Sequence, residues 1–394
     1  MHVRGWIKDV MYGLIIFGIC AALILVVSVA ADNIVAKHNA VIVSKNVNSN
    51  LDYDDSLCMS VDNVSGSEND ENVNLACDGK EQDNNNINDK KIACWGDSIT
   101  YGLGGQENTY IKSEAGIIDA SNWNYPDTLR YYTGMDVYNL GVCGETSYEI
   151  ALRQGGIKMY VGKQVTVKPG KRTQISIVDE SGNPVILENF NGYETDNQQP
   201  ENVVYINDIP FKLEYDNSRI YISIYDNAVD KSVKLKKGSQ IITKAAHDIS
   251  GDVLVIQMGS NGGWNDYDEL IEQYKAMIAN SGTECYIIIG DTDNPEESVD
   301  SANYTSSQEI GTDDSMWEAA LREAFGEHFI NMRTYLLENA LNIAGLEPTQ
   351  MDEEDLSQGR VPETIKYDYT HLNSYGYYAI GYGVYEKGLE LGYW

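Results

Sequence analysis

Short apolar segments alternate with helix-forming segments from Lys91 to the C-terminus, and most of the apolar segments end in a glycine. The apolar segments have the length of strands, whereas the segments between them carry apolar residues at helical spacing. Strands that alternate with helices predict an α/β domain with a mainly parallel sheet. The predicted strands are 91–95, 134–141, 252–258, 285–290 and 327–332, and the predicted helices include 266–280, 314–326 and 333–344.

Residues 157–246 interrupt this alternation with short β-rich runs that turn signals separate, such as Lys168-Pro169-Gly170. The pattern predicts a small all-β domain inserted between the second and third strands of the α/β domain. The α/β domain then comprises 91–156 and 247–394. The predicted strands of the insertion are 164–167, 174–178, 203–206, 220–225 and 240–243.

The N-terminal residues 1–31 contain an uncharged apolar run of 22 residues, 10–31, which Arg4 and Lys8 precede. That length can span a bilayer as a helix, and the flanking charges place the N-terminus in the cytoplasm. The run also ends in small residues that could form a signal-peptidase site. We therefore expect a membrane anchor or a cleaved signal, with a buried soluble helix as the third alternative. Either of the first two places the remaining chain outside the cytoplasm, as a single-pass membrane protein or a secreted one.

Residues 32–90 are rich in Asn, Asp and Ser and poor in aromatic residues, which predicts a disordered linker. Cys58 and Cys77 lie in this segment and could form a disulfide outside the cell. The six cysteines of the chain match no zinc-binding spacing. A formal net charge of −32 opposes binding to nucleic-acid phosphates, so nucleic acid is not an expected partner. The sequence leaves the oligomeric state open.

Ser98 follows the first predicted strand directly, and Gly96 and Gly102 flank it. Glycines allow the backbone to turn sharply and to approach a substrate closely, as a nucleophilic serine requires. A Gly-Asp-Ser sequence by itself is also common in ordinary turns, where Asp and Ser cap helices. Ser98 is therefore a candidate nucleophile that needs a base.

His371 is the best placed of five histidines to act as that base. His2 and His38 lie near the apolar N-terminal run, His247 borders the insertion, and His328 falls in a predicted strand. Asp368 precedes His371 by three residues, so its carboxylate could fold back onto the imidazole and fix the tautomer. In the alternative interpretation, the two residues only cap the last predicted helix.

Gly144 and Asn261 follow the second and third predicted strands. The backbone N–H of a glycine and the side-chain amide of an asparagine can both donate hydrogen bonds to an oxyanion. Because ligands bind at the ends of the strands in open α/β sheets, both residues are candidates for an oxyanion hole beside Ser98. Either one alone could equally belong to an ordinary turn.

The order Ser98, Gly144, Asn261 and Asp368-x-x-His371 resembles the SGNH hydrolase superfamily, also called the GDSL esterase/lipase family. The resemblance runs from Lys91 to the C-terminus without the insertion, roughly half of the chain. It implies a flavodoxin-like three-layer α/β/α fold and no metal or organic cofactor. It also implies that Ser98 is the nucleophile, His371 the base and Asp368 its orienting acid, with an oxyanion hole from Ser98, Gly144 and Asn261. Gly262 and Leu372 stand where the family often has Asp and Pro.

The resemblance predicts a serine esterase that forms an acyl-serine intermediate, and the N-terminal apolar run predicts that it acts outside the cytoplasm. An O-acetyl group on a carbohydrate or glycoconjugate is the expected ester. This expectation combines the cell-surface location, the β-rich insertion near the active-site strands and the 28 tyrosines, whose rings with a polar tip suit wet grooves. An O-acyltransferase acting on surface polysaccharide, a lipase or lysophospholipase, and an inactive surface carbohydrate-binding protein remain alternatives. The expected partners are a small ester or acylated glycan and, through the N-terminal helix, the membrane.

Overall fold

The structure of the chain is a computed structural model that describes residues 90–113, 116–185, 187, 202–216, 219–294, 297–300 and 315–394. The predicted segment 1–31, the linker up to residue 89, and Cys58 and Cys77 lie outside the described residues. No helix in the described part of the chain combines the length and the apolar character needed to cross a membrane.

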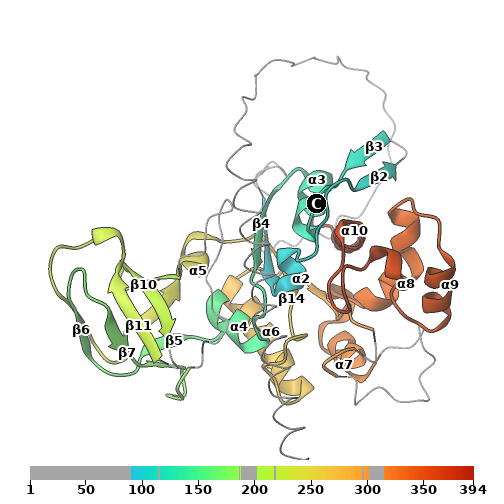
Figure 1. Ribbon diagram of the computed structural model, residues 1–394. Helices are drawn as coiled ribbons and strands as arrows, with labels where there is room; N and C mark the ends of the chain where they lie inside the picture. The colour runs from blue at the N-terminus through green and yellow to red at the C-terminus, as the bar shows by residue number, and fades with distance from the viewer. Residues whose placement is uncertain are drawn as a thin grey trace, which may run out of the picture. The chain divides into compact units, whose positions relative to one another are not determined.

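Five parallel strands form the central sheet in the order β16-β15-β14-β1-β4. Figure 1 labels β4 and β14 of this sheet. Counted along the chain, this order is 2-1-3-4-5. The predicted α/β arrangement with a parallel sheet is therefore confirmed. The last strand is shorter than predicted because residues 326–328 form a 3₁₀ turn. The strands are β1 (Lys91–Gly96), β4 (Asp136–Gly141), β14 (Val253–Gln257), β15 (Tyr286–Ile289) and β16 (Phe329–Ile330).

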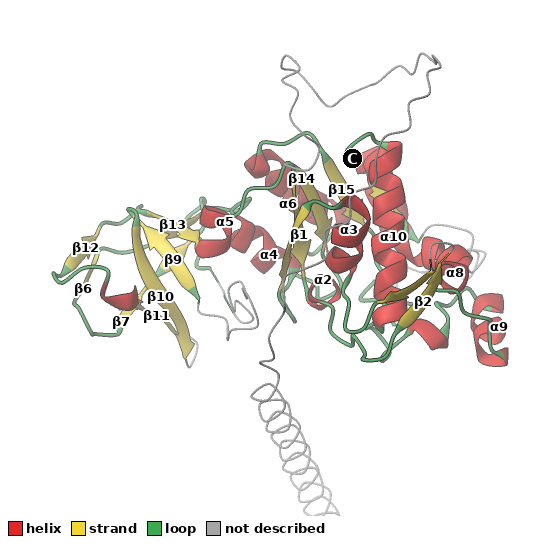
Figure 2. Ribbon diagram, turned by 90° about the horizontal axis from the view of Figure 1, so that it is seen from above, coloured by secondary structure: helices red, strands yellow, loops and turns green. Residues whose placement is uncertain are grey.

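Helices pack on both faces of this sheet (Figure 2). The side chains of a strand point alternately to its two faces, so Ile92 and Cys94 pack with α3, α8 and α10, whereas Ala93 and Trp95 pack with α4, α6 and α7. Burial on both faces explains why the strands are continuously apolar. The helices are α2 (Ser98–Tyr101), α3 (Tyr125–Thr133), α4 (Ser147–Gln154), α5 (Lys244–Asp248), α6 (Tyr267–Ser281), α7 (Met316–Phe325), α8 (Met332–Ile343), α9 (Gln350–Ser357) and α10 (Ser374–Glu390).

The chain between α4 and α5 forms a separate, nearly closed antiparallel β-barrel. Its seven-stranded sheet has the order β7-β11-β10-β9-β13-β5-β8. Because only Ser176 separates β7 from β8, the two outer strands of the sheet are consecutive in the chain, and the sheet must curl back on itself. The strands are β5 (Met159–Val161), β7 (Thr173–Ile175), β8 (Ile177–Val178), β9 (Val203–Ile206), β10 (Ile209–Asp216), β11 (Arg219–Ile224) and β13 (Gln240–Thr243).

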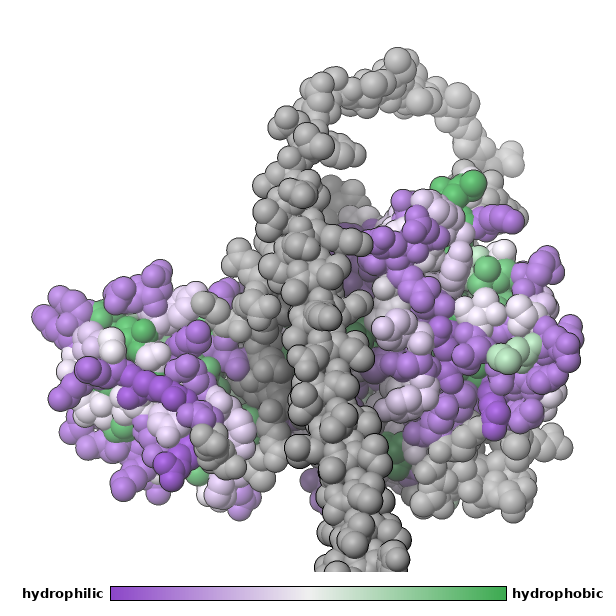
Figure 3. All heavy atoms as spheres, viewed as in Figure 1, coloured by the Kyte–Doolittle hydropathy of each residue, from purple (hydrophilic) through white to green (hydrophobic). Residues whose placement is uncertain are grey.

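Two further antiparallel pairs accompany the two sheets. One pair, β6 (Val165–Val167) and β12 (Val233–Leu235), belongs to the insertion. The other, β2 (Tyr110–Ser113) and β3 (Gly116–Asp119), is a hairpin that the sequence pattern does not predict. Where Figure 3 draws the described residues uncovered, their surface is mostly hydrophilic with small separate apolar spots, consistent with the acidic composition.

Gly96 and Gly141 face each other in register at the ends of β1 and β4. A Cβ on Gly141 would overlap the backbone nitrogen of Tyr101, and a Cβ on Gly96 would overlap the hydroxyl oxygen of Thr100; both of these residues are in α2. The two glycines therefore let α2 lie directly against the strand ends.

We expect Gly141→Ala to lower the free energy of unfolding by about 3 kcal/mol, because a backbone atom must move to admit the new methyl group. Gly134→Ala is the control, since a Cβ there meets nothing within 4 Å and the cost is the left-handed backbone alone, about 1 kcal/mol. Urea unfolding of both variants checks this. An equal or smaller loss for Gly141→Ala would contradict the close approach of α2.

Candidate active site

Ser98 is the first residue of α2 and lies directly beyond the end of β1. Asp97 caps this short helix, because its carboxylate accepts a hydrogen bond from the Ile99 N–H at 2.9 Å. Gly102 ends the helix in the left-handed conformation, with φ of 93°. Only 6% of Ser98 is exposed. The turn that the sequence predicts at this point thus presents the serine at the carboxyl edge of the sheet.

The loop before α10 brings His371 and Asp368 together. The Nδ1 atom of His371 lies 2.9 Å from Asp368 Oδ2 and 3.0 Å from Asp368 Oδ1. The same carboxylate accepts hydrogen bonds from the backbone N–H groups of Thr370 and His371. Partial burial raises the pKa of Asp368, but the hydrogen bonds from His371 and Thr370 outweigh it, so the net pKa lies below its ordinary value. Asp368 is therefore held as a carboxylate.

The imidazole of His371 also reaches the candidate nucleophile. Its Nε2 atom lies 2.9 Å from Ser98 Oγ. Helix α10 is capped by Asn373, whose side chain accepts from the N–H groups of Tyr375 and Gly376. Because the cap is Asn373, the interpretation of Asp368 and His371 as capping residues of that helix does not describe this loop. The three side chains form a continuous Ser–His–Asp hydrogen-bonded series.

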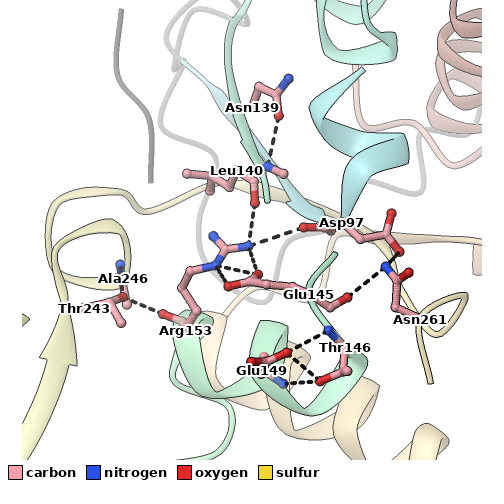
Figure 4. A network of polar contacts seen from close by, with 12 residues as sticks. Asp97, Asn139, Leu140, Glu145, Thr146, Glu149, Arg153, Thr243, Ala246 and Asn261 are labelled. Carbon is pink, nitrogen blue, oxygen red and sulfur yellow. Dashed lines mark hydrogen bonds and ion pairs between the residues drawn. The ribbon is translucent and has the colours of Figure 1, made fainter. Parts of the chain in front are cut away.

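Asn261 lies on the loop after β14, and Gly144 lies on the loop after β4. Figure 4 shows the Asn261 amide directed toward Asp97 and Glu145, which adjoin Ser98 and Gly144 in the sequence. The Asn261 amide nitrogen donates to the Glu145 carbonyl oxygen at 3.1 Å and lies 3.4 Å from Asp97 Oδ2. Gly144 has φ of 79° in the turn before α4. Strands β1 and β14 are neighbours where the strand order reverses, which is the place where open α/β sheets bind ligands.

An amide nitrogen carries two hydrogens, and both hydrogens of Asn261 have acceptors within the protein. To stabilise an oxyanion, Asn261 would have to release the contact to Asp97 or to Glu145. The structure thus places Asn261 at the site, with its amide hydrogens directed to Asp97 and to the Glu145 carbonyl oxygen.

A buried ion pair between Arg153 and Glu145 supports these loops, and the sequence pattern gives no indication of it. Both side chains are 0% exposed, and Arg153 Nη2 lies 2.7 Å from Glu145 Oε2. The same nitrogen donates to the carbonyl oxygens of Leu140 at 2.8 Å and Gly96 at 3.3 Å. Burial raises the pKa of Glu145 to about 7, although the adjacent guanidinium of Arg153 acts in the opposite direction. The pair therefore ties the ends of β1 and β4 to the loop of Gly144.

A second feature missed by the sequence analysis is a group of buried carboxyl groups at the same edge of the sheet. Asp291 follows β15 and accepts hydrogen bonds from Ser260 Oγ at 3.1 Å and Ser298 Oγ at 2.8 Å. Burial, with help from the charge of Asp291, raises the pKa of Asp97 to about 7 and that of Asp293 to about 9. In the sequence, the polar residues 291–294 directly after the fourth apolar segment could have indicated these carboxyl groups. No group of three or more His, Cys, Asp or Glu in the described residues is arranged to hold a metal ion.

Comparison of the chain with protein-family models, with curated proteins and with solved structures found no match.

The raised pKa of Asp97 predicts how stability depends on pH. Between 3.8, the ordinary pKa, and about 7, the folded chain binds a proton that the unfolded chain does not. The stability contributed by this group is complete below that range and is lost as the pH rises through it. From about pH 5 to about pH 8, the wild type should lose roughly 2 kcal/mol more than Asp97→Asn. Urea unfolding across this range measures the difference, and parallel pH profiles would contradict the assignment.

Removing only Arg153 leaves Glu145 buried without a partner. We expect Arg153→Met to cost about 3 to 5 kcal/mol, and Arg153→Met combined with Glu145→Gln to recover a substantial part of the loss. Thermal and urea unfolding of both single variants and the double variant complete the cycle. Additive losses would show that the two side chains do not act as a pair.

Proposed function

We propose that this chain is a serine esterase in which Ser98 is the nucleophile, His371 the general base and Asp368 the residue that orients the imidazole. The observation that carries the proposal is the contact of Ser98 Oγ with His371 Nε2 at 2.9 Å, with His371 Nδ1 held by the Asp368 carboxylate. A hydroxyl becomes an effective nucleophile when an adjacent oriented base accepts its proton.

In the proposed reaction, Ser98 Oγ attacks the carbonyl carbon of an ester while His371 takes the hydroxyl proton. The carbonyl oxygen becomes an oxyanion, and the tetrahedral intermediate collapses when the alcohol leaves with the proton from His371. Water, activated by the same imidazole, then attacks the acyl-serine and releases the acid. Asp368 stabilises the imidazolium in both steps.

The proposed oxyanion donors are the backbone N–H groups of Ser98 and Gly144 and the amide of Asn261. Ser98 is the first residue of α2, where backbone N–H groups have no acceptor within the helix. Asn261 joins them when its amide turns from Asp97 or the Glu145 carbonyl to the substrate. Such preorganised donors supply a large part of the acceleration in acyl transfer.

The strand order 2-1-3-4-5 is the order of flavodoxin-like sheets, and helices on both faces fit the proposed three-layer α/β/α sandwich. Together with the site geometry, this supports membership of the SGNH hydrolase superfamily. An extracytoplasmic location, by anchor or by secretion, is part of the proposal and depends on residues 10–31. The proposed substrate is an acylated carbohydrate or glycoconjugate.

Ser98→Ala should reduce hydrolysis of p-nitrophenyl acetate on the order of 10⁴-fold or more, because no other group takes the place of the nucleophile. Ser357→Ala, at the exposed end of α9, is the control and should keep wild-type activity. A fluorophosphonate probe should label Ser98 in the wild type and in the control. Circular dichroism establishes that both variants are folded. Wild-type rates in Ser98→Ala, or a label on another residue, would overturn the proposal.

A further inference from the structure

A cavity of about 350 Å³ lies next to the loops of the proposed oxyanion donors. Its lining begins two residues after Gly144 and two residues after Asn261, so it adjoins both loops. The loops are joined at this point, because the Ser147 N–H donates to the Gly262 carbonyl oxygen at 3.0 Å. We name this cavity the Trp264 pocket, and it is lined by Thr146, Tyr148, Glu149, Gly263, Trp264, Asn265 and Glu269.

Hydrogen bonds fix the walls of the Trp264 pocket. Glu149 is 3% exposed, and its Oε2 atom accepts from the Thr146 N–H and hydroxyl (Figure 4). Glu269 accepts from the backbone and side-chain nitrogens of Asn265. These bonds hold both carboxylates in place before any ligand arrives, which lowers the ordering cost of binding.

A hydrogen bond and two ring contacts also fix the side chain of Trp264. Its Nε1–H donates to the Gly259 carbonyl oxygen at 3.0 Å. Its ring lies 5.4 Å from that of the buried Trp317 and 5.8 Å from that of Tyr267, measured between centroids. With the indole N–H satisfied by the protein, the ring contributes an apolar surface to the pocket.

The lining combines two aromatic rings, two carboxylates and one amide, and no Lys, Arg or His. Carboxylate oxygens accept hydrogen bonds from hydroxyl groups, and aromatic rings pack against the apolar face of a ring-shaped ligand. Two carboxylates without a basic residue repel anionic ligands. Small-molecule sites span about 300 to 1,000 Å³, so this pocket suits a compact polar ring better than a long acyl chain.

We propose that the Trp264 pocket binds an uncharged sugar ring in the alcohol part of the substrate. This inference rests on the proposed esterase function, because it places the sugar beside an ester that Ser98 attacks. Trp264 and Tyr148 contact the face of the ring, and Glu149, Glu269 and Asn265 accept or donate hydrogen bonds at its edge. The pocket thereby selects neutral acylated sugars over anionic ones and over simple lipids.

Comparing the hydrolysis of a sugar ester with that of a simple ester distinguishes a loss of sugar binding from a loss of catalysis. Trp264→Ala should lower kcat/KM for 6-O-acetylglucose, whose other hydroxyl groups are free, by roughly tenfold or more, mainly through KM, and change p-nitrophenyl acetate hydrolysis by less than about twofold. Glu269→Gln, which alters an exposed side chain, should lower only the sugar-ester rate. Trp123→Ala changes a half-buried tryptophan outside the pocket and should affect neither ester selectively. Equal losses on both esters for Trp264→Ala and no selective loss for Glu269→Gln would overturn the inference.

A binding measurement removes the dependence on turnover. Neutral tetrasaccharides of glucose, xylose and N-acetylglucosamine are titrated into the full-length Ser98→Ala chain, and tryptophan fluorescence is followed. At least one should change the signal, and the change should vanish when Trp264→Phe is added but persist when Trp123→Phe is added. A change that survives Trp264→Phe, or no change with any sugar, would refute the pocket assignment. An inactive wild type that still shows the Trp264-dependent change would instead refute the esterase and retain the sugar site.

Discussion

The buried ion pair of Arg153 and Glu145 is the interaction on which the site depends. Removing two charges from water is costly, and this pair is 0% exposed. Further hydrogen bonds of Arg153 offset part of that cost, although its Nη1 atom is buried without a hydrogen-bond partner. Arg153 Nη2 donates hydrogen bonds to the carbonyl oxygens of Gly96 and Leu140, at the ends of β1 and β4. Ser98 and Gly144 follow those two strand ends, so one guanidinium fixes the spacing between the proposed nucleophile and an oxyanion donor.

Acidic side chains are concentrated where the proposed reaction creates negative charge. Asp97, Asp291 and Asp293 are all buried at the carboxyl edge of the sheet, and burial raises their pKa values. A proton on Asp97 would reduce the repulsion of an oxyanion and weaken the hold of that carboxyl on the Asn261 amide. The raised pKa of Asp97 and the hydrogen bond of the Asn261 amide are therefore linked, because both depend on the charge of the same carboxyl group.

The inserted barrel contacts the site through α4. Leu152 packs in the core of the barrel, and Thr243 at the end of β13 donates to the Arg153 carbonyl oxygen at 2.5 Å. Tyr148 packs against the same core and also lines the Trp264 pocket. One helix thus carries the buried arginine, a wall of the Trp264 pocket and the attachment of the insertion, so the proposed sugar site and the barrel packing share one element.

The sequence by itself determined the features that depend on short stretches of chain. Apolar runs predicted the strands, turn residues predicted the β-rich insertion, and the spacing of Asp368 and His371 allowed their contact, because each rests on local backbone geometry. Only the tertiary structure decided that Arg153 meets Glu145, that Asp291 lies near Asp97, and that residues 263–265 face Tyr148. Those contacts join separate strand ends, and their partners follow from strand order, which no local pattern encodes. The same holds for barrel closure, since pairing among β5, β8 and β13 depends on how the whole sheet curls.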